Sequence, residues 1–106
     1  MSKYLFRVTL TMEGLKGLLK EGGTARREVV ERMVQSLGGQ LESMHWAFGE
    51  EDVYVVVDLP GNASAAAMGL TASAAGGVRT STVVLLTPEE IDEAVRQKVD
   101  YRAPGA

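Results

Sequence analysis

Most of the side chains that could do chemistry lie in one stretch, HWAFGEEDVYVVVDLP, at residues 45–60. His45 is the only histidine of the chain, and an imidazole can take up and release a proton near neutral pH. It is therefore the natural general acid or base. Trp46 follows it directly, while Asp52 and Tyr54 come after a short acidic segment. The pattern suits either a small catalytic cluster or two strands joined by an acidic turn.

Strand alternation would place His45 and Trp46 on opposite faces of a sheet. Asp52 could reach His45 across a hairpin, and such a carboxylate would fix the imidazole tautomer, so His45 and Asp52 are the candidate catalytic pair. Arg7, Trp46 and Tyr54 are the candidate ligand-binding residues. The alternative is a histidine hydrogen-bonded within a subunit interface, which is favoured because no nucleophile or second histidine accompanies it.

A metal site is a weaker interpretation of the same stretch. Glu50, Glu51, Asp52 and Asp58 could join His45 as ligands. Acids at the tip of a hairpin, however, ordinarily keep a turn in water. We therefore predict no metal and no cofactor.

A second cluster precedes it in the chain. Gly22-Gly23-Thr24, followed by Arg26 and Arg27, resembles a helix start that binds an anion. It matches neither the phosphate-loop spacing nor the dinucleotide-binding spacing. A break in a helix beside solvated arginines is the favoured interpretation.

Hydrophobic periodicity indicates which elements carry these residues. Apolar residues alternate with a period of two in residues 4–11 and 78–86, and recur every three or four residues after Glu13. An alanine-rich composition indicates a further helix at residues 62–75. Gly49 is expected to supply an unusual backbone angle in the hairpin, and Thr87-Pro88-Glu89-Glu90 is a helix capping box. The predicted strands are 4–11, 41–48, 52–59 and 78–86. The predicted helices are 13–37, 62–75 and 88–98, and the first of these is broken at residues 22–23.

This order, β-α-β-β-α-β with a short C-terminal helix, predicts a ferredoxin-like α+β fold. Both main helices would cover one face of a four-stranded antiparallel sheet. Residues 1–99 are expected to form one domain, and residues 100–106 a tail.

The other sheet face would be open. Strands one, two and four carry large apolar residues in both registers, for example Leu5 with Phe6, or Leu41 with Met44 and Trp46. A solvated face would be more polar. The expected partner is therefore a second copy of the chain, packed through the open face as a homodimer or a higher homo-oligomer.

The composition limits which other classes of partner are expected. The formal net charge is −3, with 11 basic and 14 acidic residues, which gives no electrostatic case for nucleic acid. The absence of cysteine excludes disulfides and zinc–sulfur sites. No apolar run is long enough for a signal peptide or a membrane span. A cytoplasmic protein with no nucleic-acid or membrane partner is expected.

Five segments in their order and spacing resemble the GYD domain family: Lys3–Phe6, Thr11–Leu15, Gly38–Glu42, Phe48–Val53 and Asp58–Ala63. The resemblance implies a ferredoxin-like domain of the dimeric α/β-barrel type, and little about activity. The glycine, tyrosine and aspartate that name the family would fall on Gly49, position 51 and Asp52. Glu51 stands in place of that tyrosine.

Three functions fit these expectations. The first is a small oligomeric module that holds a small, partly apolar molecule in the barrel interior or a subunit cleft. The second is an enzyme similar to cofactor-free monooxygenases, in which His45 is the general base and Arg7 or Asp52 orients an aromatic substrate. The third is a structural subunit that only oligomerises.

Overall fold

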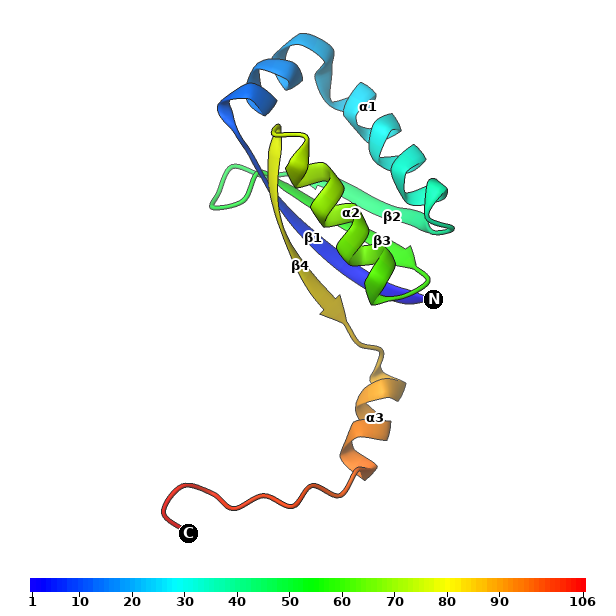
Figure 1. The fold of residues 1–106 in the computed structure, drawn as a ribbon, viewed down its shortest axis with the longest axis vertical. Helices are drawn as coiled ribbons and strands as arrows, with labels where there is room; N and C mark the ends of the chain where they lie inside the picture. Colours follow the sequence, from blue (N-terminus) through cyan, green and yellow to red (C-terminus); the bar gives the residue numbers. More distant parts are fainter.

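The structure is a computed structural model that describes all residues, 1–106. Strands and helices follow one another in the predicted order, and the fold is the expected ferredoxin-like α+β arrangement with a C-terminal helix (Figure 1). The elements are β1 (Ser2–Leu10), α1 (Met12–Ser36), β2 (Gln40–Trp46), β3 (Val53–Leu59), α2 (Asn62–Ala74), β4 (Val78–Leu85) and α3 (Pro88–Arg96).

The four strands form one antiparallel sheet in the order β2-β3-β1-β4. In Figure 1, α1 and α2 lie over the same face of this sheet. We call this the helix face and the opposite one the open face. No helix covers the open face, because the two connections that cross the sheet, through α1 and α2, both run over the helix face.

The core lies between the helix face and the helices. Alternate residues of β1 and β3 point into it, as the period of two predicts. The Tyr4 hydroxyl, on a side chain only 1% exposed, donates a hydrogen bond to Asn62 Oδ1 at 2.7 Å, so its polar atom is satisfied. The buried hydrophobic residues are Tyr4, Phe6, Val30, Val34, Val53, Val55, Val57, Leu59, Ala65 and Met68.

Helix α1 is bent within its length. The Thr11 side chain caps its first turn by accepting a hydrogen bond from Gly14 N–H. Gly22 has a φ of +84°, which interrupts the helix where the sequence predicts a break. Only the second part carries buried residues, Val30 and Val34. The helix ends at a glycine-based cap, in which Gly38 has a φ of +79° and Gly39 N–H donates to Val34 O at 3.0 Å.

Strand β2 departs from the predicted alternation. Leu41 pairs with Val57, and Met44 pairs with Val55, because a β-bulge lies between Leu41 and Ser43. Both apolar side chains therefore share the helix face, although they are three positions apart in the sequence. The inference that strand two is apolar in both registers was wrong, since the extra residue of the bulge reverses the alternation.

The hairpin between β2 and β3 is wider than expected. Ala47 N–H donates to Asp52 O at 2.9 Å and closes a loop that includes Phe48. Gly49 has no positive φ, which corrects the expected backbone angle. A loop of this length can reverse the chain without a left-handed residue.

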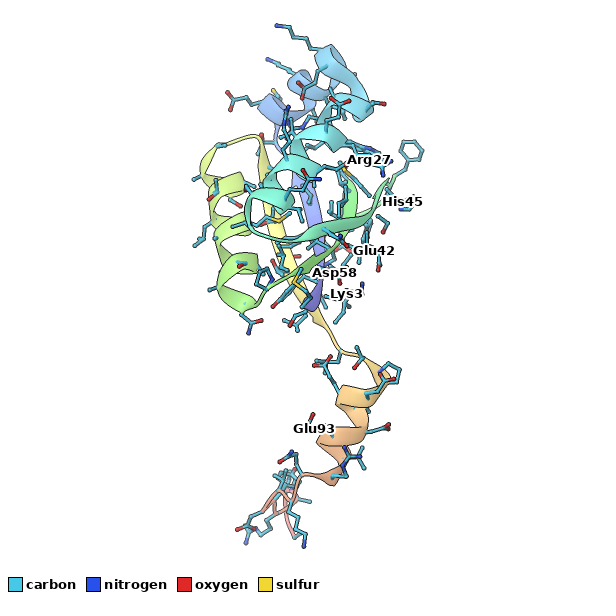
Figure 2. All side chains as sticks on the ribbon, turned by 90° about the vertical axis from the view of Figure 1, so that its right-hand side faces the viewer. Lys3, Arg27, Glu42, His45, Asp58 and Glu93 are labelled. Atoms are coloured by element: carbon cyan, nitrogen blue, oxygen red, sulfur yellow. The ribbon has the colours of Figure 1, made fainter.

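Helix α3 stands apart from the sheet (Figures 1 and 2). The predicted capping box is present: Glu90 N–H donates to Thr87 Oγ1, and Thr87 N–H donates to Glu90 Oε1, both at 3.0 Å. None of its residues is buried. Because α3 and the residues after it project, the molecule is 57 Å long against 33 and 23 Å in the other directions. No helix combines the length and the apolar character that crossing a membrane requires.

Candidate functional site

Three of the sequence-predicted site residues lie in one row across the open face. His45 on β2 is the cross-strand neighbour of Tyr54 on β3, and Tyr54 is in turn the neighbour of Arg7 on β1. Ser81 on β4 extends the row, and its Oγ accepts a hydrogen bond from Arg7 Nε at 3.1 Å. The side chains of such neighbours stand about 5 Å apart. We call these four residues the polar row.

An apolar row lies next to it on the same face. Val56, Leu5 and Val83 are neighbours across β3, β1 and β4, and each is half-buried although no helix covers them. On its other side lie charged groups, where Lys3 forms ion pairs with Glu42 and with Asp58, the latter at 3.0 Å (Figure 2). The open face therefore has an apolar centre between two polar margins.

Lys3 makes a pH-dependent contribution to stability. Its side-chain hydrogen bonds to Glu42 and then Asp58 raise the pKa of Lys3 above the ordinary value of 10.5. Because the folded state holds this proton more tightly, the stabilisation is complete below pH 10.5 and is lost as the pH rises through the raised value. We expect Lys3→Met to lower the urea midpoint slightly at neutral pH and to have no effect at a pH above the raised pKa.

Lys20→Met is the control for this comparison. Lys20 is exposed, and it takes part in none of the four ion pairs that the structure contains, two of which are those of Lys3. Its substitution should leave the midpoint unchanged at both pH values. A Lys3→Met deficit that persisted at the alkaline pH would contradict the assigned electrostatic origin.

Asp52 lies at the end of β1 and not beside His45. Its Oδ2 accepts a hydrogen bond from Leu10 N–H, and its own N–H donates to Val8 O, both at 2.9 Å. The neighbouring Glu51, which replaces the family tyrosine, accepts a hydrogen bond from Thr9 Oγ1 at 2.8 Å. Both acids thus tie the hairpin to β1.

We expect Asp52→Ala to destabilise the fold by about 1–3 kcal/mol, because the partly buried Leu10 N–H loses its acceptor. Asp52→Asn keeps an acceptor oxygen and should recover most of that loss. Equilibrium unfolding in urea measures both variants. Equal stability of Asp52→Ala and the unmodified protein would show that the Leu10 hydrogen bond contributes nothing.

Trp46 lies on the helix face, where its cross-strand neighbour is the buried Val53. It lines a cavity between α1, α2 and the sheet, whose volume is about 70 Å³ when measured as the space open to the centre of a water molecule. Twelve of the fifteen lining residues are hydrophobic, and Arg26 supplies the only charge.

The structure therefore brings Arg7, His45 and Tyr54 together and separates Trp46 and Asp52 from them. Sequence reasoning treated Arg26 as solvated and missed its position at the cavity. A signal was present, because Arg26, Val30 and Met33 have the spacing of one helix face. No three His, Asp or Glu side chains are grouped so that they could hold a metal ion.

Together, the antiparallel sheet, the two helices on one face and the open second face define a ferredoxin-like α+β domain. The model of the GYD domain family matches residues 4–95, and the chain belongs to this family. This confirms the resemblance carried by the five sequence segments. A search of curated proteins found no match. The family identifies a small domain and does not by itself specify a reaction.

Proposed function

We propose that the protein is a homodimeric module that packs its open face against that of a second copy and holds a small, partly apolar molecule at the subunit boundary. The observation that supports it is the apolar row of Leu5, Val56 and Val83, which lies at the centre of a sheet face that no helix covers. Two such faces can pack about 10 Å apart, with their side chains interdigitating.

Charge also favours self-association through this face. In a two-fold interface each copy presents the same surface to its partner, so the surface must complement itself. The open face carries Lys3 and Arg7 as well as Glu42 and Asp58. Both signs are present, and a two-fold axis can place opposite charges against each other.

The polar row provides groups for a ligand. Arg7 has a guanidinium with donors beyond the one used on Ser81. His45 and Tyr54 are exposed, and each can donate or accept a hydrogen bond. A few polar groups beside an apolar surface are the usual composition of a small-molecule site.

Sedimentation equilibrium at micromolar concentration tests the dimer. The unmodified protein should sediment as a dimer, and Val56→Glu as a folded monomer, because two carboxylates would be buried without partners. Leu70→Glu is the control, since Leu70 is 71% exposed on α2, on the other side of the sheet. A monomeric unmodified protein would end the proposal.

Native mass spectrometry of the purified dimer tests the ligand. We expect a retained small molecule that is lost from Arg7→Gln while the dimer persists. A dimer that never retains a molecule would instead support a subunit whose only role is assembly.

A second candidate function is supported by the position of His45 beside Tyr54. We propose as the alternative that His45 takes the hydroxyl proton of a quinol-like substrate and that Arg7 orients the resulting anion. Dioxygen then oxidises this anion to a hydroxyquinone, with one oxygen atom entering the ring and the other leaving in water. Oxygen uptake with soluble quinols should be measurable and should fall at least about a hundredfold in His45→Ala. Uptake that His45→Ala leaves unchanged would rule this activity out.

A further inference from the structure

The cavity under the helices is a second place where the molecule could hold a ligand. We propose that it binds a small apolar molecule with one negatively charged head group, such as a short aliphatic or aromatic carboxylate, and that Arg26 is the counter-ion of that group. The proposal needs no second subunit. It is therefore independent of the proposed function of the open face.

The interior of the cavity is suited to an apolar group. Phe6, Val55 and Met68 contribute to its lining from β1, β3 and α2, and Trp46 contributes from β2. Its volume of about 70 Å³ is several times the roughly 10–15 Å³ that one water needs. Water gains few hydrogen bonds there, because Arg26 and Thr80 are the only lining residues with polar side-chain hydrogen-bonding groups besides the Trp46 indole.

Arg26 lies where this cavity meets a wider hollow. The hollow runs between the first part of α1 and the end of α2 and has a volume of about 380 Å³ on the same measure. The residues that line both spaces are Leu10, Arg26, Met33, Ala72 and Val78. Glu21 and Thr71 add polar groups to it. A ligand entering through the hollow would place its apolar part inside and its charged head beside Arg26.

The guanidinium is available to such a head group. Arg26 Nη1 contacts Glu21 Oε1 at 3.3 Å, and both side chains are about two-fifths exposed, so water weakens this ion pair. A guanidinium has five N–H donors and can bind a carboxylate through two parallel hydrogen bonds. A ligand carboxylate whose apolar part is buried in the cavity can therefore displace the Glu21 carboxylate from Arg26.

The bend in α1 creates this arrangement. Gly22 turns the chain between Glu21 and Arg26, and places the two charges across the bend from each other. Gly23 lies against Trp46, because a Cβ at this position would be 3.4 Å from the indole Nε1. Arg26 at the mouth of the cavity, and the glycine that packs against the cavity-lining Trp46, thus both lie next to the same interruption of the helix.

Fluorescence of Trp46, the only tryptophan, gives a direct readout. The full-length protein is titrated with hexanoate and phenylacetate, and with their neutral amides hexanamide and phenylacetamide. We expect saturable changes in the millimolar range or below, with each acid binding at least about tenfold more tightly than its amide. The proposal would be overturned by the unmodified protein alone if no probe gave a saturable response, or if acid and amide bound with equal affinity.

Variants then locate the charge. Arg26→Gln should reduce the affinity for hexanoate to that for hexanamide and leave the amide affinity unchanged, while Glu21→Gln should strengthen hexanoate binding. Arg27→Gln is the matched control, because Arg27 pairs with Glu31, is 60% exposed and does not line the cavity. Loss of the acid preference in Arg27→Gln, or its retention in Arg26→Gln, would overturn the assignment.

A cavity-filling variant locates the apolar part. Ala72 lines both the cavity and the hollow, so Ala72→Leu should abolish binding of acids and amides alike. Thermal unfolding followed by circular dichroism confirms that this variant is folded. Undiminished binding to folded Ala72→Leu would show that the probes bind elsewhere.

Discussion

Replacing Phe6 by alanine is expected to destabilise the fold by about 3–5 kcal/mol. Phe6 is 1% exposed and lies on β1, one of the two central strands of the sheet, where it packs with the buried core under the helices. Its ring also borders the existing cavity. The space left by the ring would therefore join a void that the neighbouring side chains already fail to fill, which favours the upper part of this range.

Equilibrium unfolding in urea measures the loss. Leu70→Ala is the matched control, because Leu70 is 71% exposed and should change the stability by about 0.5 kcal/mol or less. Leu5→Ala adds a second test, since Leu5 is the next residue of β1 but lies on the open face. If two open faces pair, its cost should increase with protein concentration. If Phe6→Ala lowered the free energy of unfolding by less than an ordinary surface substitution does, Phe6 would not be a core residue.

The second large effect is expected at Gly39. A methyl group there would overlap the backbone oxygen of Asp58 and would lie 2.7 Å from Leu59 Cδ2 and 3.2 Å from Val34 Cγ1. Backbone cannot move aside as a flexible side chain can. Gly39→Ala should therefore cost at least about 1–3 kcal/mol by overpacking, together with a shift of the start of β2.

Substitutions at two other glycines distinguish the cost of close packing from the cost of an unfavourable backbone conformation. A Cβ at Gly49 would have no heavy atom within 4 Å, and Gly49 has no positive φ, so Gly49→Ala should be close to neutral. Gly38 has a φ of +79° but only ordinary contact with Pro60, so Gly38→Ala should cost about 1 kcal/mol through strain. Chemical denaturation of all three variants gives the order. A stable Gly39→Ala would show that the start of β2 can move away from β3 without cost.

The sheet divides the residues of the candidate site between its two faces. Arg7, His45 and Tyr54 lie on the open face, while Trp46 lies under the helices. The proposed dimer concerns the first face and the proposed acid-binding cavity concerns the second. The two proposals can therefore fail separately: Val56→Glu tests one and Arg26→Gln tests the other.

Much of the fold could be predicted because the signals that define each element are local. The period of two in β1 and β3, the interruption at Gly22 and the capping box at Thr87 all depend on residues a few positions apart. The side chains and backbone groups that form these features are neighbours in the chain before folding. Their type and spacing are enough to indicate a strand, a bend or a helix start.

The candidate site was predicted only in part, for a different reason. Alternation alone separates His45 from Trp46. Which residue stands beside His45 depends on the pairing register of β2 and β3, which a bulge between Leu41 and Ser43 shifts by one residue. Asp52 was expected near His45, yet its carboxylate accepts a hydrogen bond from the backbone of β1, which is distant in sequence.

The order of strands and helices, the family, and the placement of His45 and Trp46 on opposite faces all follow from the amino-acid sequence. The alignment of Arg7 and Tyr54 with His45, and the position of Arg26 at the mouth of an apolar cavity, become visible in the folded chain. The physical reason is the range of the interactions. Propensity, capping and periodicity act within a few residues, whereas strand register and the space left between packed helices depend on contacts between segments far apart in the chain.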